Sequence, residues 1–542
     1  MQGLMMGTQL LVSSLLRNAA TNHAATEVVS RTVEGPIHRY GYGDLECRAR
    51  RLANALRELG IGPSDRVGTL AWNTYRHVEI YYASSGSGAV CHTVNPRLFA
   101  GQIAYIVNHG EDKVLFIDLT FVPLVERLAD RFETVEAHVI MTDEAHMPET
   151  SLPGALCYET LMAGASEDFE WPSFDENTAS TLCYSSGTTG NPKGVLYSHR
   201  STVLHAMSAA LPDVINVAAT DTTMPVVPMF HVNAWGFPYF TAMMGAKLVL
   251  PGPLADGASI YQMLETERVT ISAGVPTVWL GLLQYLEETG KTLSTVKRLV
   301  IGGSAVPRAM IEAFLARHGV EVRHAWGMTE MSPLGTINSP THRTGDETPQ
   351  RFCDRQVKQG RVFFGVEMKI VDDDDKPLPE DGVAFGMLKV RGPWVCRSYY
   401  RESGSDTHDD KGWFATGDVA TIDPGRNMQV TDRSKDVIKS GGEWISSIEL
   451  ENIAIGHPEI AEAASIGVRH PKWDERPLLV AVRREGSELT REALLAYFEG
   501  KVARWWVPDD VVFVDELPHT ATGKLLKMQL REDYKDHVLP TA

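Results

Sequence analysis

Short, continuously apolar runs alternate with longer stretches of helical periodicity through most of this sequence. Between residues 45 and 59, leucine and alanine recur every three or four positions, and Gly60 follows where a helix would end. A similar pattern predicts a helix over 122–132. Apolar strands that alternate with helices are typical of parallel sheets. We therefore predict an α/β fold, with strands at 67–71, 113–118, 247–250, 270–273 and 298–301.

Composition and charge narrow the class of protein. The 542 residues carry a formal net charge of −18, because 69 acidic residues outnumber 51 basic ones. This surplus repels a nucleic-acid backbone and disfavours nucleic-acid binding as the main task, although a local loop can still bind a small phosphate ligand. The apolar stretch 1–16 lacks the basic start of a signal peptide, so it predicts a short helix packed on the body. No apolar run approaches the length that spans a bilayer.

The cysteines and the last fifth of the chain add two expectations. No two of the six cysteines form a CxxC pair, so we expect reduced thiols and a cytoplasmic protein. About a third of the residues from Lys435 onward are charged, against about a fifth before it. This shift predicts a large N-terminal domain over 1–434 and a small C-terminal domain over 435–542. The oligomeric state stays open, with a homodimer among the alternatives.

One loop carries a clear chemical signal. Residues 184–194 read YSSGTTGNPKG, with three glycines, four hydroxyl side chains and Lys193 after an apolar strand. Glycines let successive backbone N–H groups point at one anion, while hydroxyls and a lysine add donors and charge. The Walker A pattern is absent. The segment therefore predicts a phosphate-binding loop of another type.

Five further motifs follow this loop in order. They are Gly302-Gly303-Ser304-Ala305, Trp326-Gly327-Met328-Thr329-Glu330, a Thr-Gly-Asp segment ending at Asp418, the segment 432–443, and Thr522-Gly523-Lys524. Together with the loop, these motifs resemble those of the adenylate-forming enzymes, a family that includes acyl-CoA synthetases, luciferases and the adenylation domains of peptide synthetases. The segment 432–443 resembles the hinge motif of that family, and the resemblance extends over essentially the whole chain.

The resemblance implies a more detailed fold. Its large N-terminal domain has parallel and mixed sheets flanked by helices, with a β-barrel-like subdomain. Its small C-terminal domain is a mobile α+β unit.

The resemblance also implies which residues bind ATP and AMP. An acceptor-only carboxylate such as Asp418 suits two ribose hydroxyls, and the guanidinium of Arg433 can hold the ribose or a phosphate from the other side. Trp326 stands where a tyrosine is commoner in the family, and an aromatic ring can stack in either case. The remaining nucleotide residues implied are Ser185, Ser186, Gly187, Thr188, Thr189, Lys193, Gly303, Ser304, Ala305 and Gly327.

Four residues are implied in catalysis. Glu330 offers the hard oxygens that Mg²⁺ prefers, and Thr329 can donate a hydrogen bond to the α-phosphate. Lys524 would neutralise the repulsion between an attacking carboxylate and the α-phosphate. His231 is implied as a gating residue near the acyl carboxylate.

The family also has a hinge and an acyl pocket. Lys435 corresponds to the hinge about which the small domain rotates between the two half-reactions. Lys439, Gly441, Gly442 and Glu443 would then serve thioester formation, since small residues let a pantetheine tunnel pass close to the backbone. The residues implied in the acyl pocket are His231, Val232, Trp235, Gly302 and Pro333. Trp235 is large enough to cap this pocket against very long acyl chains.

These features predict an ATP-dependent acid–thiol ligase that uses MgATP and coenzyme A and releases AMP and pyrophosphate. The segments around His231 and Gly441 are most similar to short- and medium-chain acyl-CoA ligases, in particular those for 3-methylmercaptopropionate in dimethylsulfoniopropionate breakdown. A general medium-chain fatty acid is the first alternative. A stand-alone protein that loads an acyl carrier protein is the second, and a nucleotide-binding regulatory protein without turnover is the third. The intact catalytic residues Lys524, Glu330 and Asp418 disfavour the last of these.

Overall fold

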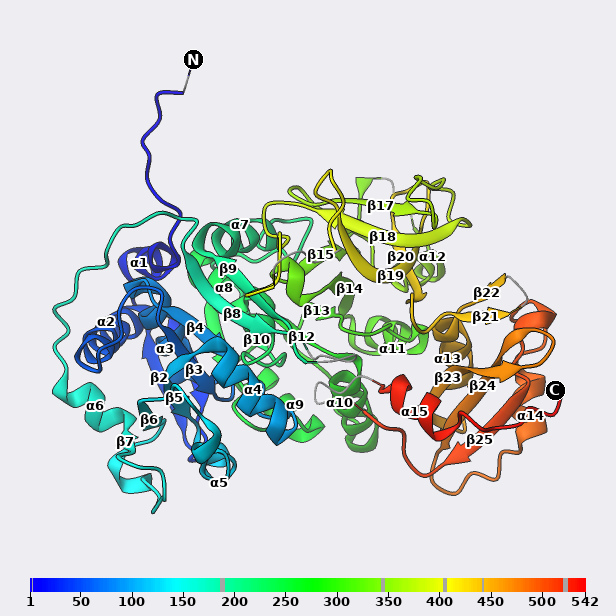
Figure 1. Cartoon of the computed structure of the whole chain (residues 1–542), viewed down its shortest axis with the longest axis horizontal. Coiled ribbons are helices and arrows are strands. Elements are labelled where there is room, and N and C mark those ends of the chain that lie inside the picture. The colour runs from blue at the N-terminus through cyan, green and yellow to red at the C-terminus, as the bar shows by residue number, and fades with distance from the viewer. Residues whose placement is uncertain (2, 186–190, 343–346, 403–406, 441–442, 520–524) are drawn as a thin grey trace.

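The computed structural model is an elongated molecule with four sheets distributed along its long axis (Figure 1). It describes residues 1, 3–185, 191–342, 347–402, 407–440, 443–519 and 525–542. Early residues (blue and cyan) fill one end, and the last residues (orange and red) form the other. No helix in these ranges is long and apolar enough to cross a membrane.

The first sheet is parallel except at one edge. Its order is β7-β6-β5-β3-β4-β8-β9, and only the pair β8–β9 is antiparallel. This edge pair supports the predicted phosphate-binding loop. The strands are β3 (Arg66–Leu70), β4 (Val90–Thr93), β5 (Asp112–Ile117), β6 (Ala137–Ile140), β7 (Leu156–Cys157), β8 (Ala179–Tyr184) and β9 (Gly194–Ser198).

The second sheet has nine strands in the order β16-β15-β14-β13-β12-β10-β11-β1-β2. Its central strands run parallel, while β15, β16 and β2 add antiparallel edges. These strands are β1 (Glu27–Arg31), β2 (Ile37–Gly41), β10 (Thr222–Pro225), β11 (Lys247–Leu250), β12 (Ile271–Gly274), β13 (Arg298–Ile301), β14 (Glu321–Gly327), β15 (Leu334–Ile337) and β16 (Arg361–Val362). The predicted parallel α/β sheets are therefore confirmed.

Helices flank and separate these two sheets. One buried apolar cluster contains residues of both sheets, such as Val67 and Leu248, and of α3, α7 and α8, such as Val78, Ala206 and Phe237. The helices are α1 (Val12–Asn22), α2 (Tyr42–Glu58), α3 (Tyr75–Ser87), α4 (Ala100–Gly110), α5 (Val122–Glu126), α6 (Tyr158–Gly164), α7 (His199–Ala209), α8 (Phe237–Met244), α9 (Gly257–Thr266), α10 (Pro276–Thr289), α11 (Arg308–His318) and α12 (Pro349–Gln356).

Two helix predictions had different outcomes. The N-terminal apolar stretch does supply α1, whose Leu15 and Leu16 are buried against the body. The helix expected over 122–132 was wrong in length, because α5 stops at Glu126. Beyond it, Leu128 and Arg131 donate backbone hydrogen bonds three residues back, which tightens the chain into 3₁₀ turns.

The third and fourth sheets follow in chain order. An antiparallel sheet joins β17 (Glu367–Val371), β18 (Phe385–Arg391), β19 (Phe414–Ile422) and β20 (Met428–Arg433). The last sheet has its own apolar clusters, made only of residues from Ile438 onward. It contains β21 (Ile438–Ser440), β22 (Glu443–Ile445), β23 (Ile460–His470), β24 (Asp474–Arg483) and β25 (Asp510–Val514), with helices α13 (Ser447–Ile455), α14 (Arg491–Tyr497) and α15 (Lys527–Asp533).

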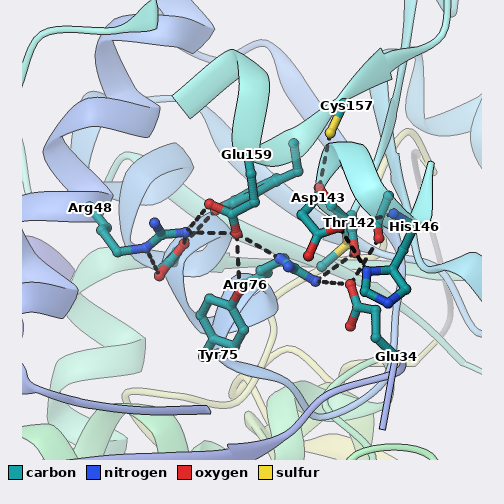
Figure 2. A network of polar contacts seen from close by, with 12 residues as sticks. Glu34, Arg48, Tyr75, Arg76, Thr142, Asp143, His146, Cys157 and Glu159 are labelled. Atoms are coloured by element: carbon teal, nitrogen blue, oxygen red, sulfur yellow. Dashed lines mark hydrogen bonds and ion pairs between the residues drawn. The ribbon is translucent and has the colours of Figure 1, made fainter. Parts of the chain in front are cut away.

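A largely buried ionic network ties α2, α3 and α6 to the turn between β1 and β2 (Figure 2). Arg76 lies between two carboxylates, with N···O distances of 2.7 Å to Glu34 and 2.9 Å to Glu159. Arg48 contacts Glu159 at 3.0 Å and the fully buried Glu79 at 2.6 Å. Two arginines thus compensate three carboxylates in a region that excludes most water.

Candidate active site

The glycine-rich loop joins β8 to β9. Its base is closed by two hydrogen bonds, from the Ser185 amide to the Lys193 carbonyl at 2.9 Å and from the Lys193 amide to Ser185 Oγ at 3.2 Å. Four predicted phosphate ligands, Ser186, Gly187, Thr188 and Thr189, lie outside the described residues. The antiparallel pairing of β8 and β9 therefore brings the two ends of the loop together.

Lys193 extends from this base toward Tyr399 and Glu402. Its Nζ lies 4.6 Å from the centre of the Tyr399 ring and 3.0 Å from Glu402 Oε2. Both side chains of the ion pair are partly exposed, so the contact is screened and weak. An incoming phosphate can therefore compete with Glu402 for the lysine.

Glu330 contacts the hydroxyl of the same tyrosine. It sits with Thr329 in a single 3₁₀ turn, η5 (Thr329–Met331), where both residues are 7% exposed. The Tyr399 hydroxyl donates to Glu330 Oε1 at 2.7 Å, and the Glu330 carbonyl accepts from the Cys396 amide at 2.8 Å. Burial and the negative charge of Glu330 raise the pKa of Tyr399 above its ordinary value, so the phenol remains a donor.

Three predicted nucleotide residues lie together next to this turn. Asp418 on β19 is 2% exposed and pairs in register with Arg433 on β20. Its Oδ2 accepts from Trp326 Nε1 at 2.8 Å, and its Oδ1 lies 2.8 Å from Arg433 Nε. A Cβ at position 335 would lie 2.7 Å from the Trp326 ring, so Gly335 makes room for the indole. The carboxylate is thus oriented by one hydrogen bond, on Oδ2, and by one ion pair, at Oδ1.

The segment after β13 lies against the predicted acyl pocket. A Cβ at Gly302 would lie 2.6 Å from the Ala325 carbonyl oxygen and 3.4 Å from the Trp235 ring, so only a glycine allows this approach. Gly303 has a positive φ of 84°, and Gly303 and Ser304 are exposed, with Ala305 intermediate. Trp235 and Gly302, predicted in the same pocket, are therefore brought together. Pro333 contacts a different predicted residue, since a Cβ at Gly327 would lie 2.1 Å from the Pro333 carbonyl oxygen.

The segment that follows His231 has an uncommon backbone. Across η4 (Val232–Gly236), φ is positive at every residue, from 42° at Val232 to 84° at Gly236. Val232, Ala234 and Trp235 each cost about 1–2 kcal/mol in this left-handed region, which asparagine enters more readily. Buried contacts hold the turn, because Asn233 Oδ1 accepts from the Tyr81 hydroxyl at 3.3 Å and from Cys183 Sγ at 3.4 Å. The fold therefore stabilises a strained turn at the predicted acyl pocket.

The hinge segment connects β20 to β21. Lys435 is exposed there, and close by, Asp432 Oδ2 on β20 accepts from the Ser447 amide at the start of α13 at 2.6 Å. Lys439 on β21 is also exposed, and its amide donates to Glu475 Oε2 at 3.0 Å. Glu443 begins β22, while Gly441, Gly442 and Lys524 lie outside the described residues.

Sequence reasoning did not single out Tyr399 or Glu402. Both belong to a polar segment before β19, and neither has a motif or spacing that sets it apart. Their relation to Lys193 and Glu330 arises only when chain segments distant in sequence fold together.

Two family models and several relatives match this chain over most of its length. A family model described as AMP-binding enzyme matches residues 15–400, and one described as AMP-binding enzyme C-terminal domain matches 449–524. The chain is 54% identical to the 3-methylmercaptopropionyl-CoA ligase of Ruegeria lacuscaerulensis, over 99% of both chains. It is 53% identical to the medium-chain-fatty-acid–CoA ligase of Ectopseudomonas oleovorans, over 99% of this chain and 98% of the relative.

Solved structures show the same fold over nearly the full length. The anthranilate CoA ligase AuaEII in complex with anthranoyl-AMP superposes with a TM-score of 0.87 at 25% identity, covering 99% of both chains. ATP-bound MatB from Rhodopseudomonas palustris has a TM-score of 0.81 at 25% identity, covering 97% of this chain and 99% of that one. The family match spans more than half of the chain, and the relatives align almost from end to end, so the protein belongs to the AMP-binding enzyme family.

Proposed function

We propose that this protein is an AMP-forming acyl-CoA ligase for a short- or medium-chain apolar carboxylate. The main support for this proposal is the arrangement of charged side chains around Tyr399. One face of its ring supports the cation of Lys193, and its hydroxyl holds the carboxylate of Glu330. Tyr399 thus holds a cation that can bind phosphate close to a carboxylate that can bind a divalent metal. MgATP requires both groups.

In the first half-reaction, a carboxylate oxygen of the acid attacks the α-phosphorus of ATP. The bond from that phosphorus to the bridging oxygen breaks, and pyrophosphate leaves with the electron pair. Lys193 would hold the leaving phosphates and Thr329 the α-phosphate, while Asp418 and Arg433 would hold the ribose. Lys524 would neutralise the charge that the two anions bring together.

The residues around Glu330 fit a Mg²⁺ ion. The Tyr399 hydroxyl occupies Oε1, and Oε2 makes no hydrogen bond among the described residues. Magnesium in such enzymes takes one or two carboxylates together with substrate phosphates. Bound there, the ion would offset phosphate charge; Glu330 would hold it, and Tyr399 would keep the carboxylate oriented.

In the second half-reaction, the sulfur of coenzyme A attacks the acyl carbon of the acyl-adenylate. AMP leaves with the electrons of the carbon–oxygen bond, and the thiol proton passes to solvent. We propose that the unit 435–542 turns about Lys435 relative to 1–434 between the two steps. The strand that carries Lys439, together with Gly441, Gly442 and Glu443, would then face the site.

The acid is proposed to be 3-methylmercaptopropionate, which would place the reaction in dimethylsulfoniopropionate breakdown. Support comes from the relatives of that name in two Ruegeria species, at 54% and 52% identity. A general medium-chain fatty acid is the alternative, because the relative with that activity in its name is 53% identical. We place the reaction in the cytoplasm, since all six cysteines are free thiols.

The test is AMP and acyl-CoA formation from MgATP and coenzyme A with acetate, 3-methylthiopropionate, butyrate, hexanoate, octanoate, palmitate and benzoate. We expect the highest kcat/KM with 3-methylthiopropionate. A maximum at hexanoate or octanoate would keep the mechanism and favour the medium-chain alternative. Pyrophosphate exchange without any thioester would instead support loading of a carrier protein.

The division of roles has its own test. We expect Lys524→Ala to abolish AMP formation from the acid, yet to spare most thioester formation from supplied acyl-adenylate. Equal loss of both half-reactions would contradict the role proposed for Lys524.

A further inference from the structure

A buried histidine outside the family motifs lies between two segments of the candidate site. These are the phosphate turn, η5 with Thr329 and Glu330, and the acyl segment 231–236. His205, on α7, is 2% exposed, and its Nε2 accepts a hydrogen bond from the Leu334 amide at 3.2 Å. Burial lowers its pKa to about 3, so the ring stays neutral and keeps this acceptor lone pair at physiological pH.

On one side, His205 contacts the segment that carries the phosphate turn. Leu334 begins β15 only three residues after η5, the turn of Thr329 and Glu330. The Trp394 indole donates to the Leu334 carbonyl at 3.2 Å and meets the His205 ring edge-on. Together, the imidazole and the indole bond both the amide and the carbonyl of the residue at the start of β15.

On its other side, the same ring contacts the acyl segment. Gly236 ends the left-handed turn η4, and a Cβ there would lie 3.1 Å from both Cε1 and Nδ1 of His205. The imidazole therefore packs directly on the backbone of Gly236, one residue after Trp235. A strained turn depends on such contacts to keep its position.

From these contacts we infer that His205 is a positioning residue for acyl transfer to AMP. It fixes the acyl segment 231–236 relative to the phosphate turn, so that the bound carboxylate meets the α-phosphorus in line. The inference rests on the proposed function and extends it to a residue outside the predicted site. Misplacement of reacting groups by about 1 Å can lower a rate about 100-fold.

The chain offers a matched control on the same helix. His199 is fully buried, its Nδ1 accepts from the Val12 amide at 3.1 Å, and burial lowers its pKa to about 4. It contacts the N-terminal helix region instead of the site. His199→Phe therefore removes an equivalent buried acceptor without touching the acyl segment or the phosphate turn.

Two variants of His205 separate its two contacts. His205→Phe keeps a flat ring on Gly236 and removes the acceptor for Leu334, whereas His205→Gln keeps an acceptor and removes the ring. The second variant also covers the case in which the first is not recovered folded. Each is compared with His199→Phe for thermal stability, AMP affinity by calorimetry, and kcat and KM of AMP formation across the acid panel.

We expect His205→Phe to lower kcat for AMP formation by about 10- to 100-fold and to flatten the preference among acids. Its AMP affinity should stay within about 3-fold of wild type, and its stability loss should match that of His199→Phe. The inference is overturned if neither His205 variant differs from His199→Phe in kcat or acid preference, or if AMP affinity falls as much as kcat. Failure of the wild-type protein to form AMP with any acid would refute the proposed function instead.

Discussion

The indole of Trp326 offers a direct test of the nucleotide site. Its Nε1 donates to Asp418 Oδ2 at 2.8 Å, on a carboxylate that is 2% exposed. Trp326→Phe keeps an aromatic face for stacking and removes only this donor. We expect AMP and ATP to bind more weakly, because the carboxylate proposed to hold the ribose loses one of the two groups that orient it.

The size of the effect follows from the partners of Asp418. A hydrogen bond to a charged group contributes about 1.5–3 kcal/mol. Arg433 offers little compensation, since its side chain is 44% exposed and such ion pairs contribute about 0–1 kcal/mol. If the lost hydrogen-bond energy weakens the AMP complex and not the free protein, the Kd for AMP rises about 10- to 100-fold.

The assay is calorimetric titration with AMP, together with urea denaturation of each variant. Trp279→Phe is the control: Trp279 is fully buried in α10, and its Nε1 has no hydrogen-bond partner among the described residues. The control should lose some stability and keep its AMP affinity. Equal AMP affinity in wild type and Trp326→Phe would refute the role of the indole in holding Asp418.

Three further predictions concern the metal, the acid and the fold. Tyr399→Phe removes the donor to Glu330 Oε1, so the Mg²⁺ concentration for half-maximal rate should rise about 10-fold. An unchanged Mg²⁺ dependence would contradict the proposed role of Tyr399 in orienting Glu330. Trp235→Ala should extend the range of acids to longer chains in the same panel, whereas an unchanged profile would remove Trp235 from the pocket. Arg76→Met leaves the buried carboxylate of Glu34 without its arginine and removes one of the two arginines that contact Glu159, so it should cost about 3–5 kcal/mol in urea denaturation. Burial raises the pKa values of these two carboxyls, but the neighbouring arginines outweigh it and hold both below 4.5. Their stabilising effect is therefore complete above about pH 4.5 and is lost as the pH falls through the lowered values, a dependence that Arg76→Met should weaken.

The sequence predicts the sheets well because parallel strands are buried on both faces. The runs 247–250 and 298–301 are the strands β11 and β13 with the same bounds, and the last three residues of each are fully buried. The helix predicted over 122–132 fails because apolar spacing does not distinguish an α-helix from shorter 3₁₀ turns.

The sequence names candidate site residues but does not predict the contacts between them. It names Asp418 and Arg433 for the ribose, but only the pairing of β19 with β20 sets them side by side. Tyr399 escapes prediction for the same reason, since its bond to Glu330 joins positions 69 residues apart. Such contacts depend on tertiary packing, which no local pattern encodes.

The acyl segment shows why some structure runs against local preference. Val232 is β-branched, and a φ of 42° is strongly disfavoured for it, so no propensity predicts a left-handed turn here. The turn exists because Tyr81 and Cys183 bond Asn233 and because His205 packs on Gly236. Several elements of the N-terminal body thus stabilise one costly stretch of backbone. Strain that a fold stabilises from several directions is typical of functional sites, where local rules yield to the requirement for one geometry. The left-handed turn is therefore a reason to propose an acyl pocket here that does not depend on the family motifs.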